Sequence, residues 1–242
     1  MREELLRKDL VEYALQSVRN RLMERVKEYP DDRLLEILIK DAESAYDYAG
    51  RLKFRRGISR WVPDRFPDGE KIISTSAEYA YKYANDILHG RFEQGERAIS
   101  TSAQYSLHYA EDVLKGRFEL GEEAISKDAT CASRYASDVL NAKTESGGRF
   151  PLGEEAISKD AKCASWYAAE ILERNFPEGE EAISKNGQAS YDYAVTIGGR
   201  FIPGEEAISE ETRLMYLYAK DVCGGRLPDE MHNKMVMLGG FS

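Results

Sequence analysis

The sequence predicts an all-α fold, a helical repeat solenoid built from two-helix repeats of about 26 residues with capping helices at both ends. The first observation is that related segments recur at spacings of 26, 26, 32, 26, 25 and 26 residues. The second is that several columns do not vary between the repeats, and the third is that their apolar residues follow a helical period. The six full repeats and one partial repeat begin at Arg65, Arg91, Arg117, Arg149, Asn175, Arg200 and Arg226.

The first helix of each repeat is expected to be short, as in Pro151 to Ile157 of the fourth repeat. Proline is tolerated in a first helical turn, and a glutamate there suits the positive end of the helix dipole. So short a helix can be 3₁₀ in places. Phenylalanine and isoleucine columns border it and are predicted core, and an invariant glycine is expected to let another backbone come close. The glycine column is Gly69, Gly95, Gly121, Gly153, Gly179 and Gly204.

The second helix should run for about a dozen residues. In the third repeat Ala132, Tyr135, Ala136 and Val139 share one helical face, and Asp128 precedes them as a predicted N-cap. Gly90 and Gly116 end the equivalent helices of the first two repeats and are expected to form left-handed C-caps. The recurring tyrosine is predicted to be buried, with its hydroxyl bonded at the rim. This column is Tyr83, Tyr109, Tyr135, Tyr167, Tyr193 and Tyr218.

Three parts are predicted along the chain: a cap, degenerate repeat and basic connector in 1–64, six repeats in 65–225, and a C-terminal cap in 226–242. Residues 1–28 have the pattern of an amphipathic helix, and 33–52 repeat the motif with Asp41 as N-cap and Tyr48-Ala49 as the Tyr-Ala pair. The last segment is either a capping helix or an exposed methionine-rich tail. Its apolar residues are Met231, Met235, Val236 and Leu238.

Residues 51–65 depart from the repeat and are basic and aromatic. They are interpreted either as a connector that lies against the acidic repeats or as a loop that contacts an acidic partner or a nucleic acid. The candidate contact residues are Arg51, Lys53, Phe54, Arg55, Arg56, Arg60 and Trp61. A polar insertion at 141–148 is expected to be a solvent loop or, alternatively, a contact feature.

A glutamate follows each invariant glycine, and an arginine opens nearly every repeat. We interpret this pattern as a ladder of ion pairs that also involves Asp86, Asp112, Asp138 and Asp221. The alternative is a glutamate stripe aimed at a partner. The candidate partner-binding members are Glu122, Glu154 and Glu180.

The charge of the 242-residue chain is uneven. Residues 1–66 hold 15 Lys and Arg against 13 Asp and Glu, whereas residues 67–242 hold 19 against 30. Acidic repeats disfavour binding to a phosphate backbone and suit docking on a basic protein. The chain has no apolar run of 18 residues and no signal-peptide pattern, so a cytoplasmic protein that spans no membrane is expected.

No pattern of an active site, a cofactor site or a metal site is present. His89, His108 and His232 lack the spacing of a zinc helix. Cys131 and Cys163 occupy one column of successive repeats, too far apart for a disulfide, and are predicted to be free core thiols. The sequence thus predicts a non-enzymatic protein, and the alternative is an enzyme with an unrecognised site.

Two repeat segments, YANDILHGRFEQGERAIS (83–100) and YAEDVLKGRFELGEEAIS (109–126), carry a resemblance to known repeats. They resemble tandem repeats, with units close to YAxxVLxGRFxxGExAI, in proteins of large tailed bacteriophages and some giant viruses. The resemblance covers about residues 65–227 and, more weakly, 33–52. It implies a viral origin and a helical array, and it brings no activity and no site residues.

Together these observations predict a scaffold that docks on a host protein, in the host cytoplasm if the chain is viral. Its acidic face could compete for a nucleic-acid site and so inhibit a host protein, including one of a defence system. The alternative function is nucleic-acid binding through the basic segment at 51–65.

Overall fold

The computed structural model describes residues 40–55, 65–140 and 148–237, and every element in these ranges is a helix. These residues fall into two compact units, one that ends at Ile99 and one that begins at Ser100. In each unit, helices contact the neighbours that precede and follow them along the chain. The all-α repeat architecture expected from the sequence is therefore present in both units.

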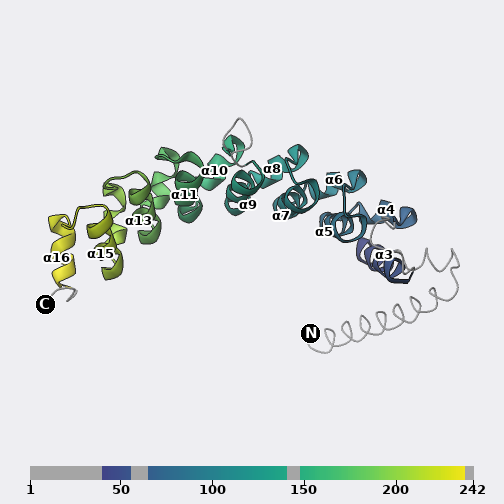
Figure 1. The fold of residues 1–242 in the computed structure, drawn as a ribbon, viewed down its shortest axis with the longest axis horizontal. Coiled ribbons are helices and arrows are strands. Elements are labelled where there is room, and N and C mark those ends of the chain that lie inside the picture. The colour runs from purple at the N-terminus through teal and green to yellow at the C-terminus, as the bar shows by residue number, and fades with distance from the viewer. Residues whose placement is uncertain (1–39, 56–64, 141–147, 238–242) are drawn as a thin grey trace, which may run out of the picture. The chain divides into compact units, whose positions relative to one another are not determined.

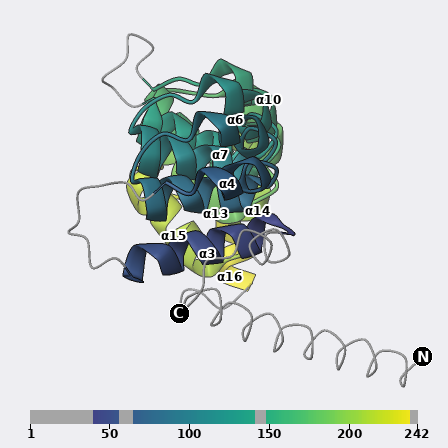
Figure 2. The same cartoon turned by 90° about the vertical axis from the view of Figure 1, so that its right-hand side faces the viewer.

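The first unit contains the degenerate repeat and the beginning of the regular ones. Figures 1 and 2 show α4 and α6 on one side of this unit and α3 on the other. Its elements are α3 (Ala42–Arg55), α4 (Pro67–Ile73), α5 (Ala77–Lys82), η1 (Tyr83–Leu88) and α6 (Glu93–Ile99).

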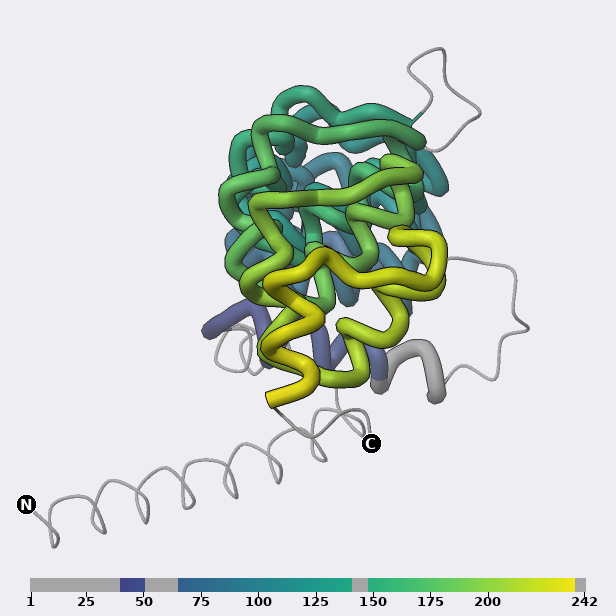
Figure 3. Tube along the Cα trace, turned by 90° about the vertical axis from the view of Figure 1, so that its left-hand side faces the viewer, coloured from purple at the N-terminus to yellow at the C-terminus, as the bar shows by residue number. Residues whose placement is uncertain are grey.

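In the second unit the short first helices follow one edge and the second helices follow the other (Figure 1), and successive repeats overlie one another along the stack (Figure 3). Its elements are α7 (Ala103–His108), η2 (Tyr109–Leu114), η3 (Glu119–Gly121), α8 (Glu122–Ile125), α9 (Ala129–Arg134), η4 (Tyr135–Val139), η5 (Pro151–Gly153), α10 (Glu154–Ile157), α11 (Ala161–Tyr167), η6 (Ala168–Leu172), η7 (Pro177–Gly179), α12 (Glu180–Ile183), α13 (Gly187–Thr196), η8 (Ile202–Gly204), α14 (Glu205–Ile208), α15 (Thr212–Asp221) and α16 (Asp229–Met237).

The first helix of a repeat is short and partly 3₁₀, as predicted. In the fourth repeat, η5 is a 3₁₀ turn that begins at Pro151 and continues into α10. The phenylalanine before this helix and the isoleucine that ends it are both buried in every full repeat. These two apolar columns anchor the short helix to the core.

The second helix begins at the predicted N-caps. Asp128, for example, accepts a hydrogen bond from the backbone N–H of Cys131 at 2.8 Å. The degenerate repeat is capped in the same way by Asp41, which accepts from the Ser44 N–H at 2.8 Å. The side chains that cap the second helices of the regular repeats are Ser76, Ser102, Asp128, Asp160 and Asn186.

The end of the second helix differs from the expectation. After the buried tyrosine region, repeats one to four change from α to π turns, in η1, η2, η4 and η6. Leu140 N–H bonds to the Tyr135 carbonyl five residues back, whereas in the fifth repeat Ile197 N–H bonds to Tyr193 four residues back. The fifth repeat is one residue shorter, and α13 is α-helical throughout. The π turn thus accommodates the additional residue of the longer repeats.

The left-handed C-caps were assigned to the wrong residues. The residue with positive φ is His89 in the first repeat and Lys115 in the second, one position before Gly90 and Gly116. The π turn causes this shift, since it moves the end of the helix. The Gly90 N–H then bonds to the Ala84 carbonyl, six residues back, at 3.1 Å.

Each invariant glycine allows a small side chain of the preceding repeat to approach. A Cβ added to Gly153 would lie 2.7 Å from the Ala132 Cβ and 2.6 Å from the Phe150 ring. The predicted close approach is therefore confirmed, although the neighbour is a small side chain rather than a backbone. The small residues that face these glycines within the two units are Ala45, Ala80, Ser106, Ala132, Ala164 and Ser190.

The predicted basic connector is partly helical. Because α3 continues to Arg55, the backbone of Arg51, Lys53, Phe54 and Arg55 belongs to this helix and not to a loop. The helical pattern of the degenerate repeat does not end at its Tyr-Ala pair. Arg56, Arg60, Trp61, the helix predicted in 1–28, the start of the repeat at 33–39, the insertion at 141–147 and Leu238 lie outside the described residues.

The C-terminal segment forms the helix α16, which packs against α15. Met231 and Met235 are buried on it, and Leu227 is buried just before it. Val236, which was expected on the packed side, is exposed. The buried methionines favour the capping helix over the exposed tail.

Candidate partner-binding surface

Each full repeat contains a polar brace around its buried tyrosine. In the third repeat, the Tyr135 hydroxyl accepts from the Phe118 backbone N–H at 3.0 Å and donates to Glu122 Oε1 at 2.8 Å. Arg117 donates from Nε and Nη2 to the two carboxylate oxygens of Glu122, both at 3.0 Å. One tyrosine thereby satisfies a backbone donor and positions a carboxylate for a bidentate ion pair.

The tyrosine ring links this brace to the next repeat. All six tyrosines of the column are fully buried, as predicted. The Tyr135 ring lies 5.2 Å from the Phe150 ring, and the Tyr193 ring lies 4.9 Å from the Phe201 ring in a T-shaped arrangement. Burial raises the pKa of the Tyr135 hydroxyl, which stays protonated and keeps donating to Glu122.

The predicted partner-binding glutamates belong to these braces. The Glu122 side chain is 13% exposed and that of Glu154 is 15% exposed. Hydrogen bonds from Arg149 hold the pKa of the Glu154 carboxyl below its ordinary value. Glu180 accepts from the Tyr193 hydroxyl at 2.8 Å. This placement favours the structural alternative, and contact of these glutamates with a partner stays a prediction.

The ion-pair ladder is arranged differently from the expectation. The Arg–Glu pairs lie within repeats, whereas two of the predicted aspartates connect neighbouring repeats through tyrosine hydroxyls. Tyr46 donates to Asp86 at 2.7 Å in the first unit, and Tyr191 donates to Asp221 at 2.7 Å in the second.

The outward surface of the second helices is the part of the second unit that varies most between repeats. It consists of the positions five before, one before and two after the buried tyrosine, which we call the outer ridge. All of its residues are exposed or half-buried. The outer ridge is formed by Gln104, His108, Glu111, Thr130, Arg134, Ser137, Lys162, Trp166, Ala169, Gln188, Asp192, Val195, Arg213, Leu217 and Lys220.

Two large apolar side chains lie on this ridge. Trp166 is 40% exposed and Val195 is 47% exposed, on the adjacent helices α11 and α13. An acidic row runs beside the ridge, three residues after each tyrosine. In the second unit this acidic row is Asp112, Asp138, Glu170 and Asp221, all exposed.

The edge of the short helices is nearly constant by comparison. Its exposed glutamates pair with lysines four residues later, as Glu123 does with Lys127 at 2.9 Å and Glu155 with Lys159 at 2.7 Å. A third such pair joins Glu181 and Lys185 at 2.8 Å. Exposed pairs of this kind contribute little to stability and repeat the same chemistry along the edge.

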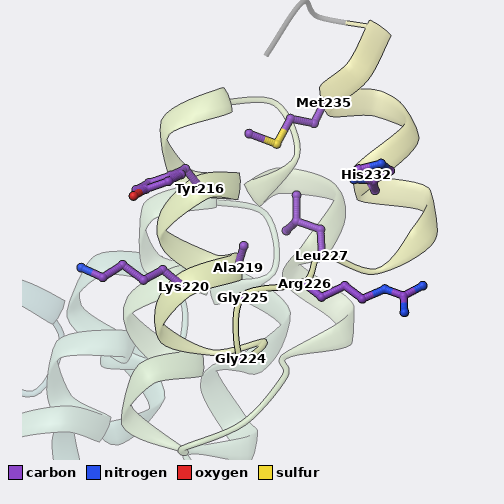
Figure 4. A pocket seen from close by; sticks show the side chains of 9 residues that line it. All are labelled: Tyr216, Ala219, Lys220, Gly224, Gly225, Arg226, Leu227, His232 and Met235. Carbon is purple, nitrogen blue, oxygen red and sulfur yellow. The ribbon is translucent and has the colours of Figure 1, made fainter. Parts of the chain in front are cut away.

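A groove of about 670 Å³ lies between α15 and α16 at the end of the second unit. Figure 4 shows Ala219, Leu227 and Met235 near its centre, with Lys220 and Arg226 extending to opposite sides. Its nine lining residues are Tyr216, Ala219, Lys220, Gly224, Gly225, Arg226, Leu227, His232 and Met235. We call this depression the C-terminal groove.

The ridge and the groove were missed by the sequence-based selection of contact residues. Trp166, Val195 and Tyr216 give no motif, because each occurs in one repeat only at its position. The available signal was the variation itself, since the three lie next to columns that do not change.

The described residues offer no metal centre, because no group of three or more His, Cys, Asp or Glu side chains could hold an ion there. Cys131 and Cys163 are free thiols, as predicted. Burial raises the pKa of Cys131 to about 12, so this thiol is not activated as a nucleophile. Among the helices of the described ranges, none combines the length and the apolar character needed to cross a bilayer.

No family model matches the chain, and no curated protein or solved structure matches it.

Proposed function

We propose that this chain is a non-enzymatic binding scaffold of viral origin that docks on a host protein. The docking surface is the outer ridge together with the acidic row beside it. The proposed setting is the host cytoplasm, and the proposed effect is inhibition of a basic host protein, such as a nucleic-acid-binding or defence protein.

One observation carries this proposal: constant positions are spent on the brace and the core, and variation concentrates on the outer ridge. A repeat array needs identical contacts between its layers, so these positions are constrained by stacking. Ridge residues take no part in the brace or in the glycine contacts and are free to suit a partner. Trp166 on this ridge is the residue type that most often dominates binding energy at interfaces.

Charge gives the proposal its partner class. Residues 67–242 carry 30 acidic against 19 basic side chains, and the acidic row places four carboxylates along the ridge. A basic protein surface is attracted to such a row, and the attraction speeds association.

The proposal is tested by capture from host lysate with the full chain and two matched variants. Trp166→Ala removes an exposed apolar side chain from the ridge, and Leu152→Ala removes one, 57% exposed, from the edge of the short helices. We expect one host protein to be retained by the parent chain and by Leu152→Ala, and its affinity to fall at least about tenfold for Trp166→Ala. Retention of nothing specific, or equal retention by both variants, would contradict the proposal.

Nucleic-acid binding through residues 51–65 is the competing function, and no described feature favours it over protein docking. It predicts binding at low salt that falls steeply as salt rises and is lost in an Arg55→Glu, Arg56→Glu variant. Nuclease treatment of the lysate separates the two functions, because it would release a partner held through nucleic acid and would leave a protein contact intact.

A further inference from the structure

The C-terminal groove lies where the second helix of a seventh repeat would stack. Arg226 occupies the position of the arginines that open repeats, Leu227 occupies the phenylalanine position, and α16 takes the place of the first helix. In the preceding repeats a second helix follows and packs beside the previous one, as α13 does against α11 and α15 against α13. Within the described residues no helix fills this place beside α15.

Tyr216 marks what the missing helix would contribute. It lies two residues before the buried tyrosine, at the position of Tyr46 and Tyr191. Those two hydroxyls each donate to an aspartate on the next second helix, at 2.7 Å. Tyr216 is 57% exposed, and its hydroxyl has no hydrogen-bond partner in the described part of the chain. The seat is therefore prepared for a helix that carries a carboxylate at this position.

The charges around the groove agree with that chemistry. Among its lining residues the ionisable groups other than Tyr216 are Lys220, Arg226 and His232, all basic types. Arg226 lies 3.7 Å from Asp229, but both side chains are almost fully exposed and this pair is weak. Between them Leu227 and Met235 give the groove an apolar centre (Figure 4).

We propose that the C-terminal groove binds an acidic amphipathic helix of a partner protein. The apolar side of this helix covers Leu227 and Met235, and one of its carboxylates accepts from the Tyr216 hydroxyl between Lys220 and Arg226. This surface is separate from the outer ridge, so it gives the scaffold a second contact with the opposite charge preference.

A peptide copied from this chain provides the probe. Residues 76–89, SAEYAYKYANDILH, form the second helix whose Asp86 accepts from Tyr46 within the first unit. A labelled peptide of this sequence with Lys82→Glu is titrated with the full chain at low salt and followed by fluorescence anisotropy. We expect saturable binding that weakens about tenfold when Asp86 is replaced by Asn, because a hydrogen bond to a charged acceptor is lost.

Variants of the full chain assign the binding to the groove. Tyr216→Phe should weaken it about tenfold, and Lys220→Glu with Arg226→Glu should abolish it, while Trp166→Ala on the ridge should leave it unchanged. All four positions are exposed, so unchanged circular dichroism and melting confirm that the variants fold. The Trp166→Ala result also separates this proposal from the proposed function.

Three results would overturn the proposal. The first is absence of peptide binding, and the second is binding that is insensitive to both Tyr216→Phe and charge reversal. The third is self-association of the chain, seen by sedimentation, that Lys220→Glu with Arg226→Glu disperses, because the occupant of the groove would then be a second copy.

Discussion

The buried tyrosine is the residue on which each repeat depends. Its hydroxyl accepts from a backbone N–H and donates to a carboxylate of the same repeat, and its ring contacts the phenylalanine of the next. Its burial and bonding could be predicted from a polar aromatic residue at a core-facing helical position. The bond from the Phe118 N–H could not, because it depends on how the chain enters the short helix.

The brace predicts a graded response to the loss of its carboxylate charge. Glu122→Gln should lower the free energy of unfolding by about 1 kcal/mol, a modest figure because the Arg117 side chain is half exposed. The melting temperature should then fall by about 2–4 °C in a calorimetric scan. Glu180→Gln is the control, since Asn175 replaces the arginine there and no ion pair to Glu180 is found in the described residues.

The control should show a smaller decrease than Glu122→Gln, because only the acceptor for Tyr193 changes. An unchanged melting temperature for Glu122→Gln together with loss of partner binding would mean that the glutamate stripe faces a partner.

At the scale of the helix, the sequence predicts type and register well and endings poorly. N-cap side chains lie at the predicted positions because a cap depends on local chemistry alone. The π turns were not predicted, since no residue type specifies them. They arise from a spacing constraint, visible only when the repeat with one residue fewer forms an α-helix throughout. The extent of α3 through Arg55 was missed because the repeat pattern ends before the helix does.

The contact between successive repeats predicts a strong effect at one glycine and a weak effect at another. Gly153→Ala should lower the free energy of unfolding by about 1–3 kcal/mol, because the new Cβ would overlap Ala132 and the Phe150 ring. Gly199→Ala should change it by no more than about 0.5 kcal/mol, because no atom lies within 4 Å of the added Cβ. Urea denaturation measures both, and equal effects would show that the glycine column does not serve close approach.

At the scale of the whole molecule, the repeat pattern predicts the architecture and leaves the contact surface open. Stacking determines which columns stay constant, and these could be read from the sequence. The residues proposed to bind are those that stacking does not constrain, such as Trp166 and Val195, so no motif identifies them. The structure adds where the variable positions lie, on one continuous face of the second helices.

The most direct measurement is hydrogen–deuterium exchange of the full chain with and without the captured partner. If the outer ridge is the docking surface, binding should slow exchange in the second helices from α9 to α15 and leave the short helices α8, α10 and α12 unchanged. Slower exchange confined to the short helices, or to residues 40–55, would contradict a scaffold that docks through its ridge.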